Sequence, residues 1–182
     1  MSHFPIPNNL DEAPSHSQPL LQAVNDSLGS VPNLFRILSH SPAALNGYLQ
    51  LNTALGEGQL DAATRERLAL AVSQQNDCQY CLAAHSYLGK HVAKLSEAEI
   101  LTNRHGSSGD EKAAIAVNFA VQLVQQRGAV QGSDIQAVLD AGYNRAELLE
   151  IIAHVALNTL SNYVNTALAT DIDFPPIASL DH

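Results

Sequence analysis

The chain has 182 residues, enough for one domain with a buried core, and 46% of them are hydrophobic, as in globular proteins. Its net charge is −9, with 9 lysines and arginines against 18 acids. Because the basic residues are few and scattered, the chain lacks the positive surface that nucleic acids and anionic membranes attract. The composition therefore argues against both classes of partner.

The N-terminus has none of the features of a targeting segment. Residues 1–14 hold three prolines and lack both a basic start and an apolar run. No apolar stretch elsewhere is long enough to span a bilayer. We therefore expect a cytoplasmic protein that folds as a single domain over residues 1–182. An extended arm is expected at 1–17 and an irregular tail at 173–182, where two adjacent prolines exclude a helix.

Apolar residues recur at intervals of three and four along almost the whole chain, and β-branched runs are short, which predicts an all-α fold. Capping residues or prolines mark the predicted helix starts, and glycines mark several of the ends. In chain order, helices are expected at 18–28, after Pro32, at 42–55, at 61–75, at 78–91, from Ser96, at 110–127, at 133–141 and from Asn144 to about 169.

Two of the predicted helices begin with similar residues. The segment 65–68 reads Arg-Glu-Arg-Leu and the segment 145–148 reads Arg-Ala-Glu-Leu, and each precedes a run rich in Leu, Ile, Val and Ala. This faint similarity is consistent with a duplicated helical unit, although few residues match.

The chain contains two cysteines, Cys78 and Cys81, which are separated by two residues and followed by His85. On one helix, these spacings bring all three side chains to one face. In a reducing compartment, such a pair is typical of catalysis or metal binding rather than of a structural disulfide. The start of a helix and a nearby histidine both favour the thiolate, which is the reactive form of cysteine.

Glu66 belongs to the preceding predicted helix. If the two helices pack antiparallel across the turn at Asn76–Asp77, Glu66 returns toward the level of His85, where it could orient the imidazole or relay a proton. Reduction of a peroxide needs an attacking thiolate, a proton donor for the leaving oxygen and a second thiol that resolves the sulfenic acid. Cys78, Cys81 and His85 supply groups of these types, so we predict a thiol-dependent peroxidase that needs no cofactor.

Other interpretations of these residues stay open. The four side chains of Glu66, Cys78, Cys81 and His85 could ligate zinc, but a structural zinc site normally adds a second Cys/His pair, and none is present. Taken singly, Glu66 is typical of an exposed acid at a helix start and His85 of an ordinary helical histidine. The alternatives are therefore a general dithiol–disulfide oxidoreductase and a non-enzymatic metal-binding or structural module.

The spacing from Glu66 through Cys78 and Cys81 to His85 resembles the motif of the AhpD-like alkylhydroperoxidases, in the carboxymuconolactone decarboxylase superfamily. Two flanking regions are similar to signatures of its peroxidase-related branch, and the resemblance spans about residues 31 to 176. These regions are Val31–Phe35 with Ser41 and Pro42, and Asn162–Asn165 followed by Asp173–Pro175.

This resemblance implies paired helices with internal pseudo-symmetry, assembled as a homo-oligomer of the trimer or hexamer type. It implies that Cys81 is the peroxidatic cysteine, Cys78 the resolving one, and His85 with Glu66 the proton relay. The substrate would be a hydroperoxide and the reductant a thiol, which a lipoylated protein carries in well-studied members. Because the true decarboxylase branch lacks the cysteine pair, lactone decarboxylation is not expected.

Two features lie outside this motif. The family places a histidine immediately before the second cysteine, whereas this chain has Tyr80, whose phenol does not titrate near neutrality. On the last predicted helix, His154, Asn158 and Asn162 recur every four residues, with Asn165 close by. This stripe is interpreted either as polar support for the cysteine site or a seam between subunits, or as a solvated helix face.

Overall fold

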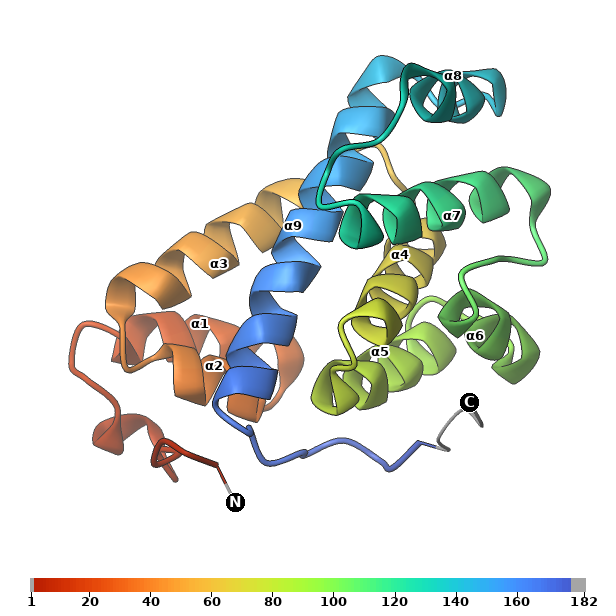
Figure 1. The fold of residues 1–182 in the computed structure, drawn as a ribbon. Coiled ribbons are helices and arrows are strands. Elements are labelled where there is room, and N and C mark those ends of the chain that lie inside the picture. The colour runs from red at the N-terminus through yellow and green to blue at the C-terminus, as the bar shows by residue number, and fades with distance from the viewer. Residues whose placement is uncertain (1, 178–182) are drawn as a thin grey trace.

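The computed structural model describes residues 2–177, and within that range it contains helices and loops but no strand, so the all-α prediction is confirmed (Figure 1). None of the described helices has both the length and the apolar character needed to cross a membrane. The elements are η1 (Leu10–Glu12, a 3-10 turn), α1 (Gln18–Leu28), α2 (Asn33–Leu38), α3 (Pro42–Gly56), α4 (Ala62–Gln75), α5 (Gln79–His91), α6 (Glu97–Arg104), α7 (Glu111–Gln125), α8 (Gly132–Asp140) and α9 (Arg145–Ala167).

Most helices begin where a capping side chain can satisfy the free N–H groups of the first turn. The side chain of Asn144 accepts from the N–H groups of Ala146 and Glu147, and the Glu147 carboxylate accepts from the Asn144 N–H, which completes a capping box. Single caps of the same kind open four further helices, at Ser41, Asp61, Ser96 and Asp110.

Two helix ends come earlier than predicted, for the same physical reason. Helix α7 stops at Gln125 because Arg127 adopts a left-handed conformation with φ of 53°, and α9 stops at Ala167 because Ala169 has φ of 49°. In both turns a following N–H reaches back five residues to a carbonyl, from Gly128 to Leu123 and from Thr170 to Asn165. Such a turn closes the helix by satisfying carbonyls that continued helix would have used.

Helix α4 lies at the centre of the fold and packs against α5, α6, α7 and α9 (Figure 1). Its residues Leu68, Leu70, Ala71 and Val72 are completely buried, although they point in different directions around the helix. A helix that is apolar on several sides must be covered on several sides. This position explains why α4 can hold α5 on one side and α9 on another.

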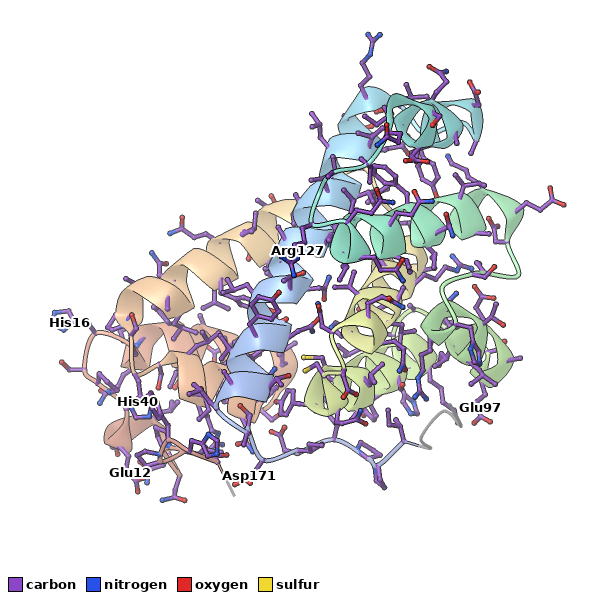
Figure 2. The ribbon with its side chains drawn as sticks, viewed as in Figure 1. Glu12, His16, His40, Glu97, Arg127 and Asp171 are labelled. Atoms are coloured by element: carbon purple, nitrogen blue, oxygen red, sulfur yellow. The ribbon has the colours of Figure 1, made fainter. Side chains whose placement is uncertain are left out.

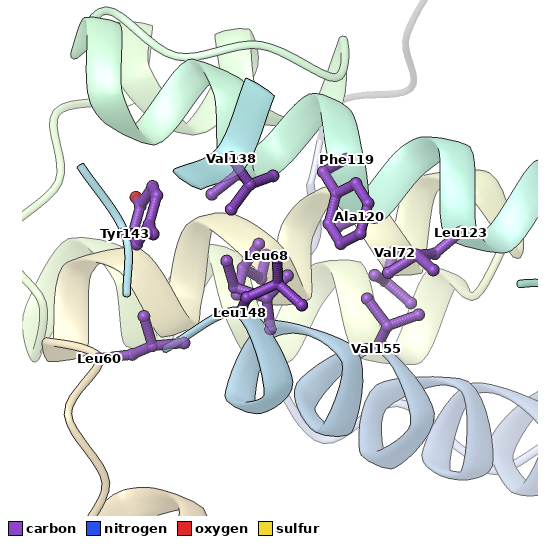
Figure 3. Close-up of a cluster of buried hydrophobic side chains, with 12 residues drawn as sticks. Leu60, Leu68, Val72, Phe119, Ala120, Leu123, Val138, Tyr143, Leu148 and Val155 are labelled. Carbon is purple, nitrogen blue, oxygen red and sulfur yellow. The ribbon is translucent and has the colours of Figure 1, made fainter. Parts of the chain in front are cut away.

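The largest apolar cluster joins α4 to α7, α8 and α9 (Figure 3). Leu68 and Val72 of α4 meet Phe119 of α7, Val138 of α8 and side chains of α9 there. Burying each such large side chain contributes roughly 1.5–3 kcal/mol relative to leaving it in water. This cluster therefore fixes α9 against α4, which matters for the site described below.

A second apolar cluster encloses the two cysteines. Cys78, Tyr80 and Cys81 pack there against Leu34 and Leu45, together with residues of α1 and the N-terminal segment. The cysteine pair is thus held between α5 and the N-terminal helices, with α9 along one side. In Figure 2 the sulfur atoms, drawn in yellow, lie where α5 approaches α9.

The start of the described chain lies against the end of α9 and the residues that follow it. The His3 N–H donates to the Leu168 carbonyl at 2.8 Å, and the Asp171 N–H donates to Ser2 Oγ at 2.8 Å. The predicted N-terminal arm is thus partly tied down and contains the η1 turn. The predicted tail is irregular from 173 to 177; Met1 and residues 178–182 lie outside the described residues. The assignment of 1–182 to one domain stays a prediction.

Candidate active site

Cys78 is the N-cap of α5, one residue later than the sequence predicts. A helix that begins at Cys78 would have Asp77 as its N-cap, but Asp77 is left-handed, with φ of 50°, which an N-cap residue does not adopt. Cys78 instead has the extended conformation of a cap, and its sulfur accepts from the Cys81 N–H at 3.3 Å. The Cys78 sulfur therefore faces the positive end of the helix dipole.

Both cysteines are free thiols, and both are buried. Cys81 follows in the first turn of α5, and its sulfur accepts a hydrogen bond from Asn165 Nδ2 of α9 at 3.3 Å. The Cys81 thiol is also hydrogen-bonded to the Cys78 sulfur. The prediction that the two sulfurs share one end of a helix is confirmed.

The proton of the reduced pair belongs on Cys81. The hydrogen bond from the Cys81 thiol lowers the pKa of Cys78 to about 7, because this bond, the Cys81 N–H and the Thr166 hydroxyl outweigh the effect of burial. The same hydrogen bond, together with burial and the Cys78 charge, raises the pKa of Cys81. Near neutral pH, a thiolate on Cys78 is thus held by the thiol of Cys81.

Glu66 folds back onto His85, as the antiparallel packing of α4 and α5 predicts. His85 Nδ1 and Glu66 Oε2 are 2.9 Å apart, and both side chains are 20% exposed. Burial acts to lower the pKa of His85, but the charge and hydrogen bond of Glu66 outweigh it and raise that pKa. The charge of Cys78 acts in the same direction. The imidazole therefore holds a proton more firmly than a free histidine does.

Tyr80 is a structural residue in this arrangement. Its hydroxyl accepts from the Leu34 N–H at 3.1 Å, and its ring packs edge-on against Phe174, with centroids 5.8 Å apart. Burial raises the pKa of its phenol further. Tyr80 thus ties α5 to α2 and to the C-terminal segment, and it carries no proton that is exchanged near neutrality.

The polar stripe on α9 is buried, so its interpretation as a solvated face is wrong. His154, Asn158, Asn162 and Asn165 are 6%, 6%, 0% and 3% exposed. They lie inside because α9 crosses the middle of the fold (Figure 1). Asn165 and Asn162 both hydrogen-bond to Cys81, and Asn162 also donates to Ser73 Oγ at 3.2 Å. The part of the stripe at Asn162 and Asn165 therefore borders the cysteine site.

The sequence did not indicate two further contributors. Thr166 hydrogen-bonds to Cys78, and Tyr48 of α3 hydrogen-bonds to Ser161 close enough to feel the charges of Cys81 and Glu66. Burial raises the pKa of Tyr48 to about 12. The position of Thr166, four residues after Asn162 on the polar face, was the available signal for it; Tyr48 offered none beyond being an aromatic residue.

The metal-binding alternative gains no support from this geometry. Among residues 2–177, no group of three or more His, Cys, Asp or Glu side chains is arranged to hold a metal ion. Glu66 and His85 are instead engaged with each other, and each cysteine with the other.

Within the described residues the fold is all-helical, and it places a dithiol at the start of α5 beside a pair formed by His85 of α5 and Glu66 of α4. Residues 42–122 match the model of the carboxymuconolactone decarboxylase family. No curated protein matches the sequence significantly.

Solved structures share the fold over nearly the whole chain. A peroxidase-related protein with an alkylhydroperoxidase AhpD core from Ralstonia eutropha JMP134 has a TM-score of 0.84 at 24% identity, covering 94% of this chain and 92% of that one. A peroxidase-related protein from Silicibacter sp. TM1040 has a TM-score of 0.79 at 23% identity, covering 97% and 92%.

The debrominase Bmp8, solved as a cysteine-to-alanine variant with 2,3,4-tribromopyrrole, is also similar. Its TM-score is 0.74 at 16% identity, and the match covers 87% of this chain and 86% of that one. At these identities the likeness establishes the fold.

Proposed function

We propose that this protein is a thiol-dependent peroxidase, in which the hydroperoxide is reduced and the Cys78–Cys81 pair is oxidised to a disulfide. The observation that carries the proposal is the polarised dithiol at the start of α5, where one sulfur is stabilised as a thiolate and the other keeps its proton. The His85–Glu66 pair one helical turn further on supplies a proton donor. The peroxidase-related structures of the same fold agree with this function.

The reaction uses two electrons of the dithiol. A cysteine thiolate attacks one peroxide oxygen, so that an S–O bond forms while the O–O bond breaks. The leaving alkoxide takes a proton, which protonated His85 can donate because Glu66 holds it in the charged form. The second cysteine then attacks the sulfenic acid, releases water and closes the Cys78–Cys81 disulfide.

The family resemblance and the electrostatics of the reduced pair favour different sulfurs for the attack on the peroxide. The family resemblance supports Cys81 as the peroxidatic cysteine and Cys78 as the resolving one. The electrostatics of the reduced pair favour the thiolate on Cys78, because Cys81 donates to it and the α5 N-terminus faces it. Attack by Cys81 requires that the proton first move from Cys81 to Cys78.

Single-cysteine variants test both the function and the roles. Cys78→Ser and Cys81→Ser are treated with one equivalent of a hydroperoxide in the presence of dimedone, and the labelled residue is located by peptide mass spectrometry. Labelling of Cys81 in Cys78→Ser supports the roles from the resemblance, and labelling of Cys78 in Cys81→Ser supports the reverse. No label in either variant contradicts peroxidase activity, and the double variant is the blank.

The role of His85 as proton donor is tested by substitution. His85→Gln removes the proton donor while keeping a side chain of similar length, so the second-order rate with peroxide should fall about a hundredfold. An unchanged rate would exclude His85 from the reaction.

A general dithiol–disulfide oxidoreductase is the second candidate, because a cysteine of lowered pKa at a helix N-terminus also suits disulfide exchange. Rates with hydroperoxides and with disulfide substrates separate the two. A brominated pyrrole belongs in the same panel, since a debrominase has this fold. The metal alternative predicts stoichiometric zinc in protein purified without added metal, and its loss in Cys78→Ser.

The partners that the resemblance implies remain predictions. They are a thiol reductant carried by a lipoylated protein, and assembly of identical chains as a trimer or hexamer.

A further inference from the structure

A pocket of about 350 Å³ opens beside the cysteine pair. Its walls are the N-terminal end of α5 with Asp77 and Cys78, the end of α9 with Asn165 and Thr166, and the following segment 169–172. Cys78 lines the pocket, whereas Cys81 lies behind it against Asn165. A molecule that enters here therefore reaches Cys78 before Cys81.

Two buried polar atoms on the wall have no hydrogen-bond partner. They are Asn165 Oδ1 and Thr170 Oγ1, whose side chains are 3% and 5% exposed. Buried polar groups are almost always satisfied by protein or by a bound molecule. Together with the neighbouring sulfur, these atoms indicate that the pocket accommodates a small molecule with a polar group.

The charge of the pocket lining indicates which kind of small molecule can enter. The pocket lining includes the carboxylate of Asp77 and, among its described residues, no Lys, Arg or His. Asp77 precedes Cys78 directly and is exposed, so its charge acts on any molecule that approaches this sulfur. An anion is therefore repelled at the mouth, whereas an uncharged molecule is not.

We infer that this pocket receives the reductant, that the reductant is a small uncharged thiol, and that it attacks Cys78 of the oxidised pair. The inference rests on the proposed function in that the pair cycles between dithiol and disulfide, and it holds whichever cysteine attacks the peroxide.

The reductant reduces the Cys78–Cys81 disulfide by thiol–disulfide exchange. The thiolate of the reductant attacks Cys78, a new S–S bond forms, and the Cys78–Cys81 bond breaks with Cys81 leaving as a thiolate. Asn165 Nδ2 is already placed to donate to that sulfur at 3.3 Å. The pKa of Cys81 is raised chiefly by Cys78, and this effect is absent while Cys78 is bonded to the reductant. A second thiol then releases Cys78, and the reductant leaves as a disulfide.

The attacked sulfur can be identified without peroxide. The full chain is oxidised to the disulfide with diamide, mixed with 2-mercaptoethanol and iodoacetamide, quenched with acid and mapped by mass spectrometry. The mercaptoethanol adduct is expected on Cys78 and the alkylated thiol on Cys81. The reverse pattern would overturn the inference and leave the peroxidase proposal intact, because no peroxide takes part.

Charge selection is tested with three thiols of similar size: neutral 2-mercaptoethanol, anionic 3-mercaptopropionate and cationic cysteamine. Rates of disulfide reduction are corrected for the thiolate fraction of each thiol. The anionic thiol is expected to react about fivefold more slowly than the neutral one, which is the effect of one unit charge at close range in water.

Asp77→Asn should reduce this difference while preserving the backbone, because Asn also tolerates a positive φ and can accept from Gln79 Nε2 as Asp77 does. Asp140→Asn is the matched control, since Asp140 likewise accepts from a glutamine at 2.8 Å but lies at the end of α8. Equal rates for neutral and anionic thiols in the wild type, or the same change in both variants, would refute the charge selection.

Discussion

The sulfur of Cys78 draws its reactivity from donors on two sides. The Cys81 N–H and thiol approach from its own helix, and the Thr166 hydroxyl approaches from α9. A buried thiolate without such donors would be unfavourable, because burial alone raises the pKa of a thiol. The arrangement thus separates two chemically identical side chains into a thiolate and a proton donor.

Alkylation of the reduced protein checks this separation. Iodoacetamide should modify Cys78 with a pH midpoint near 7, and Cys81 more slowly at neutral pH, because the pKa of Cys78 is lowered to about 7 and that of Cys81 is raised. Peptide mass spectrometry across a pH series measures both rates.

Two variants of Cys81 test the hydrogen bond from its thiol to the Cys78 sulfur. In Cys81→Ser the hydroxyl can still donate to Cys78, whereas Cys81→Ala has no donor, so the Cys78 midpoint should rise in the alanine variant only. Equal midpoints in the two variants would mean that the Cys81 side chain does not stabilise the thiolate.

His154 is a buried histidine that is held neutral. Burial lowers its pKa to about 4; Arg65 of α4 adds to this effect, while Glu66, Glu150 and the Leu55 carbonyl of α3 oppose it. The unfolded chain binds a proton near pH 6.5 and the folded chain only near 4, so stability should fall as pH decreases through this window, by about 2–3 kcal/mol.

Denaturant unfolding at several pH values between 7 and 4 measures this loss, and His154→Gln should remove its share of the pH dependence. Wild type and variant that lose stability in parallel would contradict the assignment.

At the level of elements, a single carboxylate holds three segments together. Glu99 of α6 accepts from Arg67 Nε of α4 at 2.8 Å and from the Gly109 N–H, at the start of α7, at 2.8 Å. Ser108 Oγ and Asn103 Nδ2 also donate to it. Ser96 and Glu99 have the spacing of a capping box, but only the Ser96 half forms, because the Glu99 carboxylate is engaged by these donors.

Replacing the Glu99 carboxylate should weaken the contacts that join α4, α6 and the start of α7. Burial acts to raise the pKa of Glu99, but its donors outweigh that effect and lower the pKa to about 2, so Glu99→Gln should destabilise the fold by about 1–3 kcal/mol. Urea unfolding at pH 7 measures the change. Glu97→Gln on the same helix is the control: its exposed pair with Lys90 should contribute nothing measurable, and equal losses in both variants would contradict the role of Glu99.

For the whole molecule, α9 has two contrasting faces. One face is buried against the helices around it, and the other carries large apolar side chains in contact with water, among them Leu149 and Tyr163, which are 65% and 63% exposed. Ile152 and Leu160 lie on the same side of the helix. A continuous apolar stripe of this kind is typical of an interface, and it is where we expect identical chains to associate.

Sedimentation should therefore detect an assembly larger than one chain, and Leu160→Glu should shift it toward the monomer, because a charge would be buried in the interface. Leu101→Glu, which changes an exposed leucine on α6, should leave the assembly unchanged. A monomeric wild type would exclude this use of the α9 stripe.

Much of the helical fold is readable from local sequence. Helix α1 begins and ends at the predicted residues, and Ser41, Asp61, Asp110 and Asn144 open helices as expected. Caps, glycine stops and apolar periodicity act within a few residues of each other, so no knowledge of packing is needed to recognise them. The shared face of Cys78, Cys81 and His85 could be predicted for the same reason.

The chemistry of the pair depends on segments that are distant in sequence. Asn165 reaches Cys81 from 84 residues away, and the pocket beside Cys78 exists because the segment after α9 returns to the start of α5. Whether the α9 polar stripe is buried follows from how α9 packs across α4 and α5. Such packing reflects apolar contacts summed over the whole core, and no local pattern in the sequence encodes that sum.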